Sequence, residues 1–316
     1  MTLDQFEEIF YSALKDTFEP QGTSVTRSSI EKNNETLSCL ILRRDFSGIG
    51  ITIYPKDFHK MWEEGSLMEE LLLTIKEDIM TKNIPQFNMH ELDREGAEKK
   101  LLSCVVGYEK NKSWLSNVPH ERIQDMALYA RWQICDEGSF KITNDILGTL
   151  KMTKEEVLSI AKANRKSTAF FRPMEDILFH LVDPTDIKEQ FTGVFDREVA
   201  GNAIHQLYFL GSSQPTNGAA VAMDLQVLNA VHKCLDDDFY LLPSSIHETL
   251  VIPKSTWDHG VDALRRMVCD VNGSDVPLQD QLTDNVYEFD GRSLKMAGVS
   301  EKMTVGVSME NHARRR

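Results

Sequence analysis

Apolar residues recur at helical spacing at the start of the chain, and this pattern predicts a helix over 3–18. Its members are Leu3, Phe6, Ile9, Phe10 and Leu14. Loose alternation over 24–33 and 36–43, on either side of Asn33-Asn34-Glu35, predicts a hairpin. The apolar run 48–54 predicts a third strand, and its glycines precede a strand rather than a helix, unlike those of a phosphate-binding loop.

The pattern next predicts two helices and two strands. A short helix is expected over 56–63, followed by a longer one that starts at Ser66, with Glu69 completing a capping box. Strands are expected over 101–108 and 127–134 because both runs are apolar and rich in strand-forming residues.

A further helix is predicted to begin at Thr153, with Glu156 as its capping partner. The stretch 183–203 is polar and is interrupted by Pro184 and Gly193. We therefore expect a junction between two domains there.

The last third of the chain has the clearest pattern. Strands are predicted over 206–211 and 219–223, joined by an Asn-Gly turn, and then a helix capped by Asp224. Two further strands are expected over 239–242 and 249–252.

A helix over 257–271 that ends at Gly273, and a hairpin of 286–289 with 294–296, complete the pattern. Hairpin-joined strands pair antiparallel, so we predict an α+β fold with hairpin-rich sheets and helices packed on one face. The expected domains are 1–182 and 204–297, with 183–203 as the junction and 298–316 as a disordered tail.

Composition narrows the class of protein. The 316 residues are 41% hydrophobic and 27% charged, which is typical of globular chains. The net charge of −14 argues against nucleic-acid binding and favours a protein or basic-peptide partner. Five cysteines without close pairs indicate a reducing compartment, and no stretch is long and apolar enough for a membrane span. We expect a soluble cytoplasmic protein.

One polar insert stands out between two apolar runs. In FYLLPSSIHETLVIP, which is 239–253, the candidate catalytic residues Ser244, Ser245, His247 and Glu248 lie between predicted strands. A serine that reaches His247 would be an activated nucleophile. Alternatively, the serines secure a tight corner while His247 and Glu248 bind neighbouring backbone, and strand alternation would turn those two side chains apart. We favour the corner.

Metal and cofactor signatures are missing from the pattern. The nine histidines have no spacing typical of metal ligation, and Asp236-Asp237-Asp238 lacks the further ligands of a calcium loop. We predict neither a metal nor a cofactor. Phe170, Phe171 and Arg172 are candidates for an exposed anchor that binds a partner, or for a plug between the two halves of the chain.

Several strings together resemble a known family. They are FYLLPSSIHETLVIP, with its Leu-Pro-Ser-Ser-Ile-His-Glu core, and the segments 108–111, 118–120, 172–175, 217–220 and 285–287. The resemblance is to a bacterial domain of unknown function that is frequent in gut anaerobes, and it covers about 1–296. It implies no activity, cofactor or catalytic residue.

Three functional hypotheses remain open. The first is a binding or interaction protein without catalytic activity, because no complete catalytic signature is present. The second is a hydrolase-like enzyme that uses Ser244 or Ser245 with His247. The third, an accessory protein of a mobile element or phage, is implied only by the several copies in which the resembled family occurs.

Overall fold

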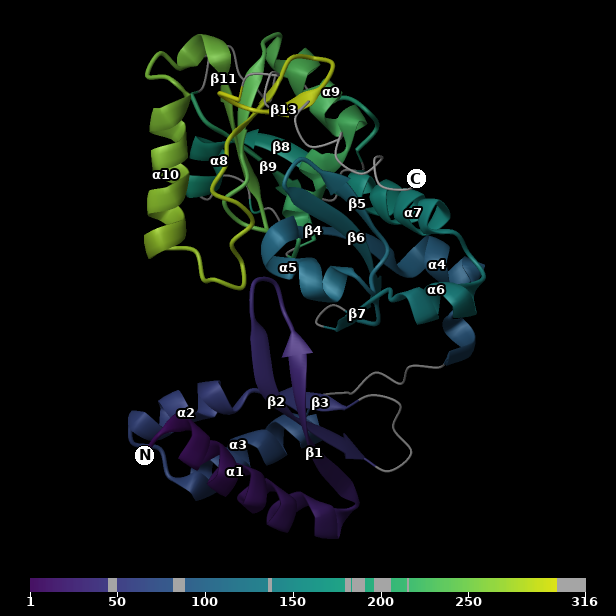
Figure 1. Ribbon diagram of the computed structural model, residues 1–316, viewed down its shortest axis with the longest axis vertical. Helices are drawn as coiled ribbons and strands as arrows, with labels where there is room; N and C mark the ends of the chain where they lie inside the picture. The colour runs from purple at the N-terminus through teal and green to yellow at the C-terminus, as the bar shows by residue number, and fades with distance from the viewer. Residues whose placement is uncertain are drawn as a thin grey trace, which may run out of the picture.

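Figure 1 shows the computed structural model of the chain. It describes residues 1–44, 50–81, 89–135, 138–179, 183, 191–195, 206–214 and 216–299. Helices and three antiparallel sheets form an α+β fold, as predicted. Among the described residues, no helix is long and apolar enough to cross a membrane.

The N-terminal lobe, residues 3–81, has a small core of its own (Figure 1). Its sheet is formed by β1 (Thr23–Glu31), β2 (Thr36–Arg44) and β3 (Ile51–Ile53). Three helices accompany it: α1 (Leu3–Phe18), α2 (Pro55–Glu63) and α3 (Met68–Thr81). Phe6, Phe10 and Leu14 of α1 are fully buried in this core. Their helical spacing places them on the one face of α1 that packs against the sheet.

The C-terminal lobe, residues 89–299, contains the other two sheets. One has the order β4-β6-β5, with β7 paired to β6. Its strands are β4 (Leu101–Gly107), β5 (His120–Ile123), β6 (Met126–Gln133) and β7 (Ser139–Lys141). Helices α4 (Arg94–Lys100), α5 (Tyr108–Leu115), α6 (Asn144–Leu150) and α7 (Lys154–Ser167) belong to the same lobe.

The larger sheet has the strand order β13-β12-β10-β11-β9-β8. Its strands are β8 (Ala169–Pro173), β9 (Tyr208–Ser212), β10 (Phe239–Leu242), β11 (Thr249–Pro253), β12 (Tyr287–Phe289) and β13 (Leu294–Met296). The remaining helices are α8 (Met174–Leu178), the 3-10 helix η4 (Gly218–Met223), α9 (Leu225–Leu235) and α10 (Val261–Ser274).

Alternation along the strands divides the larger sheet into two apolar faces. Leu241 and Val251 enter the main core together with α7, α9 and η4. Leu242 and Ile252 face the other way, toward α10. The expectation of helices on one face therefore fits the three-stranded sheet, whereas both faces of this sheet are covered.

The tip of the β1–β2 hairpin joins the two lobes (Figure 1). Asn33 Nδ2 donates to the carbonyl oxygens of Gln279 and Gln281, at 3.0 and 2.7 Å. Asn111, which is fully buried in α5, donates to Asn33 Oδ1 and accepts from the backbone N–H of Asn34. These contacts secure an otherwise polar turn against the second lobe.

Most of the predicted elements are present, and the capping box of Thr153 with Glu156 is confirmed. Three predictions were wrong. The helix predicted over 257–271 is α10, which begins at Val261, and Gly273 lies inside it rather than ending it. The segment predicted as a strand over 219–223 is the helix η4. The helix α3 begins at Met68 rather than at Ser66, and Glu70 accepts from the N–H of Leu67 at 2.8 Å.

The domain division at 183–203 stays a prediction. β8 precedes that stretch and pairs along its whole length with β9, which follows it. Most of the stretch lies outside the described residues, as does the predicted tail from residue 300 onward.

Candidate functional site

The polar insert forms the connection between β10 and β11, and His247 is its best-anchored side chain. The Nε2 atom of His247 lies 3.2 Å from Oδ1 of Asp280. Its Nδ1 atom accepts a hydrogen bond from the backbone N–H of Asn217 at 3.4 Å. Because Nδ1 accepts, the ring proton sits on Nε2 and is directed at the carboxylate.

The two serines do not reach the imidazole ring. Ser245 Oγ accepts from the backbone N–H of His247 at 2.9 Å, and Ser245 is only 3% exposed. The backbone of Ser245 forms a bridge with Gln281, and the Ser244 carbonyl accepts from the N–H of Leu282. A serine nucleophile needs its hydroxyl within hydrogen-bond reach of the base, and neither serine has that contact here.

Glu248 lies beside His247 but does not bind its ring. Burial raises the pKa of the Glu248 carboxyl above its ordinary value, while His247 and Ser245 partly counter that rise. Strand β11 begins only at Thr249, so the strand alternation expected from Ile246 onward does not apply. The four candidate residues therefore gather in one corner without forming a serine–histidine pair.

Close backbone packing holds the corner in place. The N–H of Ala219 donates to the Ile246 carbonyl, and the N–H of Ile246 donates to the Asp280 carbonyl. A Cβ atom on Gly218 would lie 2.4 Å from the His247 carbonyl oxygen, so only glycine fits at that position. Asp280 and Asn217 were missed from the sequence because each lies about 30 residues from His247 and no local pattern connects them.

Comparison with known protein families gives a match over nearly the whole chain. The model of a family of unknown function (DUF5688) matches residues 3–291. The chain belongs to this family. No curated protein and no solved structure matches the chain. The bacterial origin of the chain stays a prediction.

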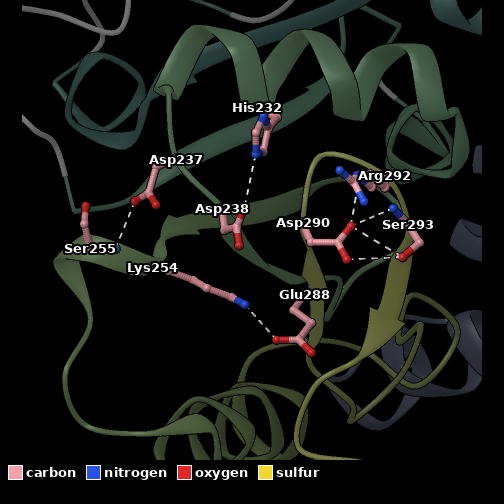
Figure 2. A network of polar contacts seen from close by, with 9 residues as sticks. All are labelled: His232, Asp237, Asp238, Lys254, Ser255, Glu288, Asp290, Arg292 and Ser293. Atoms are coloured by element: carbon pink, nitrogen blue, oxygen red, sulfur yellow. Dashed lines mark hydrogen bonds and ion pairs between the residues drawn. The ribbon is translucent and has the colours of Figure 1, made fainter. Parts of the chain in front are cut away.

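A second polar network of this DUF5688 chain lies at the opposite end of the larger sheet (Figure 2). Phe239 pairs with both Pro253 and Phe289. The residues next to these three positions therefore lie close together at the same end of their strands. There Lys254 Nζ lies 2.8 Å from Glu288 Oε2. The proximity of Lys254 and Glu288 follows from the antiparallel register, which places the start of one strand beside the end of the next.

The aspartates of this network hold neighbouring groups of the chain. Asp238 Oδ1 lies 3.1 Å from His232 Nε2, and Asp237 Oδ2 accepts from the N–H of Ser255 at 2.9 Å (Figure 2). Asp290 accepts from the backbone N–H of Ser293, and this bond lowers the pKa of the Asp290 carboxyl. Within the described residues no group of three or more His, Cys, Asp or Glu side chains could hold a metal, and the absence of a metal stays a prediction.

The aromatic candidates for partner binding lie in the core. Phe170 and Phe171 in β8 are 3% and 1% exposed, and they stack on Phe209 and Tyr208. Arg172 is half-buried and donates to the Phe171 carbonyl. An exposed aromatic anchor at this place does not fit the structure.

A small cavity of about 190 Å³ lies beside the segment 281–285. Its walls are the start of α5 at Gly107–Lys110, the Asp125 turn, Asn272 of α10 and the segment Gln281–Asn285. Asp125 accepts from Thr283 Oγ1 at 2.8 Å and from Asn285 Nδ2 at 2.9 Å. The same segment therefore supports the corner, the hairpin tip and the cavity.

Proposed function

We propose that this protein is a binding protein without catalytic activity, and that it recognises a basic peptide segment carrying apolar side chains. The proposed docking surface is the outward face of α10. One observation carries the proposal: Met267 and Val271 lie one helical turn apart on this helix and are 47% and 41% exposed. Large apolar side chains exposed on the same helix face are a common feature of interaction surfaces.

The inner face of α10 packs against the sheet, which leaves the outer face available to a partner. Leu264 and Val268 are buried against β10 and β11, so the helix is fixed to the sheet by its inner face. In Figure 1 the helix lies at the outer edge of the C-terminal lobe. A partner can reach the outer face without any rearrangement of the core.

Charge around the helix favours a basic partner. Asp258 and Asp262 have side chains that are 90% and 84% exposed, and Asp270 and Asp275 are exposed as well. Arg265 is held by Asp262 and by the Ala297 carbonyl, both at 3.0 Å. The helix itself has two aspartates and two arginines, and Asp258 and Asp275 beyond its ends make the surroundings acidic. The net charge of −14 would draw a basic partner from a distance.

The hydrolase alternative has weaker support. It rests on the His247–Asp280 pair, which resembles the base and its orienting carboxylate in a catalytic triad. However, the Ser245 hydroxyl accepts from a backbone N–H instead of donating to the ring, and Ser245 is buried. A serine would have to leave its place in the corner to react.

Peptide binding to the full-length chain tests the proposal. The probe is a fluorescent peptide of about 18 residues with leucines on one helical face and lysines on the other, measured by fluorescence anisotropy. We expect saturable binding that weakens at least several-fold between about 50 and about 300 mM salt. A matched peptide with glutamate in place of lysine should bind far more weakly. Equal affinity for both peptides would refute the proposal.

A further inference from the structure

We propose that the β1–β2 hairpin is a latch that regulates the α10 surface. Docking of its tip on the segment Leu278–Gln281 orders the C-terminal turn of α10, and release of the tip loosens that turn. The consequence for peptide binding rests on the proposed function. The consequence for α10 itself does not.

The two lobes have separate cores, so the tip can leave without exposing either one. The apolar cluster of the N-terminal lobe is formed by residues from 6–75, and the clusters of the other lobe begin at Leu92. The hydrogen bonds between the lobes gather at the hairpin tip (Figure 1). Because release exposes polar groups that water can satisfy, docking has a small net free energy, and relative motion of the lobes is expected.

The tip holds the carbonyl groups of one short segment. Asn33 Nδ2 donates to the carbonyl oxygens of Gln279 and Gln281. Asn34 Nδ2 donates to the Leu278 carbonyl at 2.9 Å and to the Gln281 carbonyl at 2.8 Å. The Gln281 carbonyl therefore accepts from both asparagines. The two amide side chains fix the path of a segment that has neither a helix nor a named strand of its own.

The side chain of Gln281 supports the end of α10. Its Nε2 atom donates to the carbonyl oxygens of Asn272 and Val276, at 2.7 and 3.0 Å. The Asn272 carbonyl is one of the last four of the helix, which have no partner inside it. In the same turn, the Val271 carbonyl accepts from the N–H groups of Asp275 and Val276, at 2.8 and 3.1 Å. Gln281 thus joins the hairpin tip directly to the last turn of α10.

The last turn of α10 carries part of the proposed docking surface. Val271 is 41% exposed there, one turn after Met267. When the tip leaves, the backbone of Gln281 loses two donors, so the helix end that its side chain supports opens more often. Opening separates Val271 from Met267, so a partner binds the docked form more tightly. By reciprocity, a bound partner favours docking of the tip.

The corner around His247 limits the size of the effect. The N–H of Ile246 donates to the Asp280 carbonyl, and the N–H of Leu282 donates to the Ser244 carbonyl. These bonds keep the segment attached to the larger sheet after the tip has left. Release therefore loosens the last turn of α10 without unfolding the lobe, as a regulatory contact requires.

Asn34→Gly releases the tip selectively. Asn34 has a left-handed backbone with φ 62°, which glycine adopts without strain, so the hairpin should keep its turn. The variant loses the donors to Leu278 and Gln281. The matched control is Thr36→Ala, which alters an exposed side chain of the same hairpin whose hydroxyl donates to Glu31.

Hydrogen exchange of the full-length chain tests the latch. The amides of Asp275 and Val276 should exchange about three- to ten-fold faster in Asn34→Gly. In Thr36→Ala their rates should be unchanged. The amide of Val251, in the core of the larger sheet, is the internal reference and should be unaffected in both variants. Unchanged exchange of Asp275 and Val276 in Asn34→Gly would overturn the inference, as would an equal acceleration of Val251.

Peptide binding tests the regulation of the surface. The lysine–leucine peptide should bind Asn34→Gly at least about three-fold more weakly than Thr36→Ala, and saturating peptide should slow exchange of the Asn34 amide in the unaltered chain. Equal affinity for both variants would refute regulation by the tip. If the peptide does not bind the unaltered chain, the proposed function is wrong, and the exchange of the α10 amides alone decides whether the latch exists.

Discussion

The Nε2 atom of His247 lies 3.2 Å from Oδ1 of Asp280, which joins the β10–β11 corner to the segment that follows α10. The same ring accepts from the Asn217 N–H, so one side chain connects three stretches of the chain. The imidazole is engaged by structural contacts on both of its nitrogens. This arrangement is the reason to regard the corner as part of the framework.

Replacing His247 with alanine should therefore destabilise the fold. We expect His247→Ala to lower the free energy of unfolding by about 1–3 kcal/mol, because the Asp280 carboxylate and the Asn217 N–H both lose a partner. Urea denaturation measures this change. The control is His259→Ala, whose side chain is 71% exposed and whose removal should change stability by less than about 0.5 kcal/mol. An unchanged stability of His247→Ala, together with loss of an ester-hydrolysing activity, would favour the hydrolase.

Glu248 predicts a pH effect at the same corner. Burial raises the pKa of its carboxyl in the folded chain, so the folded state binds more protons than the unfolded state above the unfolded pKa. The contribution of Glu248 to stability accordingly decreases as the pH rises through this range. Glu248→Gln should have a higher Tm than the unaltered chain at pH 7, and the difference should shrink toward pH 4. A constant difference across this range would contradict the assignment.

The Asn111 side chain predicts how the two lobes are held together. Asn111→Ala removes the acceptor of the Asn34 N–H and the donor to Asn33 Oδ1, at 2.8 and 2.9 Å. We expect the Asn34 amide to exchange with solvent at least ten-fold faster, as measured by hydrogen exchange. Asn117→Ala, a similar substitution just beyond α5, should leave that amide unaffected. Unchanged exchange in Asn111→Ala would mean that the hairpin tip is held by other contacts.

Lys141 lies at the same contact between lobes. Its Nζ atom donates to the Glu31 carbonyl at 2.6 Å and lies 3.7 Å from the Trp114 ring centre. Burial, with a contribution from Arg131, lowers the pKa of Lys141 to about 8. Between this value and the ordinary lysine pKa of about 10.4, the unfolded chain binds more protons, so stability should rise with pH.

Comparison with Lys141→Met isolates that effect. From pH 7 to pH 10 the unaltered chain should gain stability relative to the variant, by about 1 kcal/mol, since partial solvation reduces the full effect of the shift. Urea denaturation at both pH values provides the measurement. Parallel pH profiles for the two proteins would show that Lys141 does not titrate in this way.

The elements that could be predicted from the sequence are those governed by local rules. Thr153 and Glu156 form their capping box, because such a box needs only residues three positions apart. The strand prediction for 219–223 was wrong because a run of small apolar residues is also typical of a buried strand. In the fold, Asn217 takes a left-handed conformation with φ 58°, and Gly218 packs against His247, which starts a short helix instead.

The position of the candidate site could be predicted from the sequence, but the contacts that its residues make could not. The string around His247 marked the right corner, since polar residues between two apolar runs must turn there. Its partner Asp280 lies in an irregular segment after α10, and no periodic pattern places it beside the corner. The cavity behind Asp284 depends on Asn272 and on the start of α5, which lie far apart in the sequence and meet only in the folded chain.

Binding of the lysine–leucine peptide to an altered α10 surface tests the central claim most directly. Met267→Ser combined with Val271→Ser removes the exposed apolar side chains, and anisotropy should show at least ten-fold weaker binding. The matched control, Leu67→Ser with Leu73→Ser, alters side chains that are 64% and 55% exposed at α3 and should bind as the unaltered chain does. Equal peptide affinity for the two double variants would contradict the assignment of α10 as the docking surface.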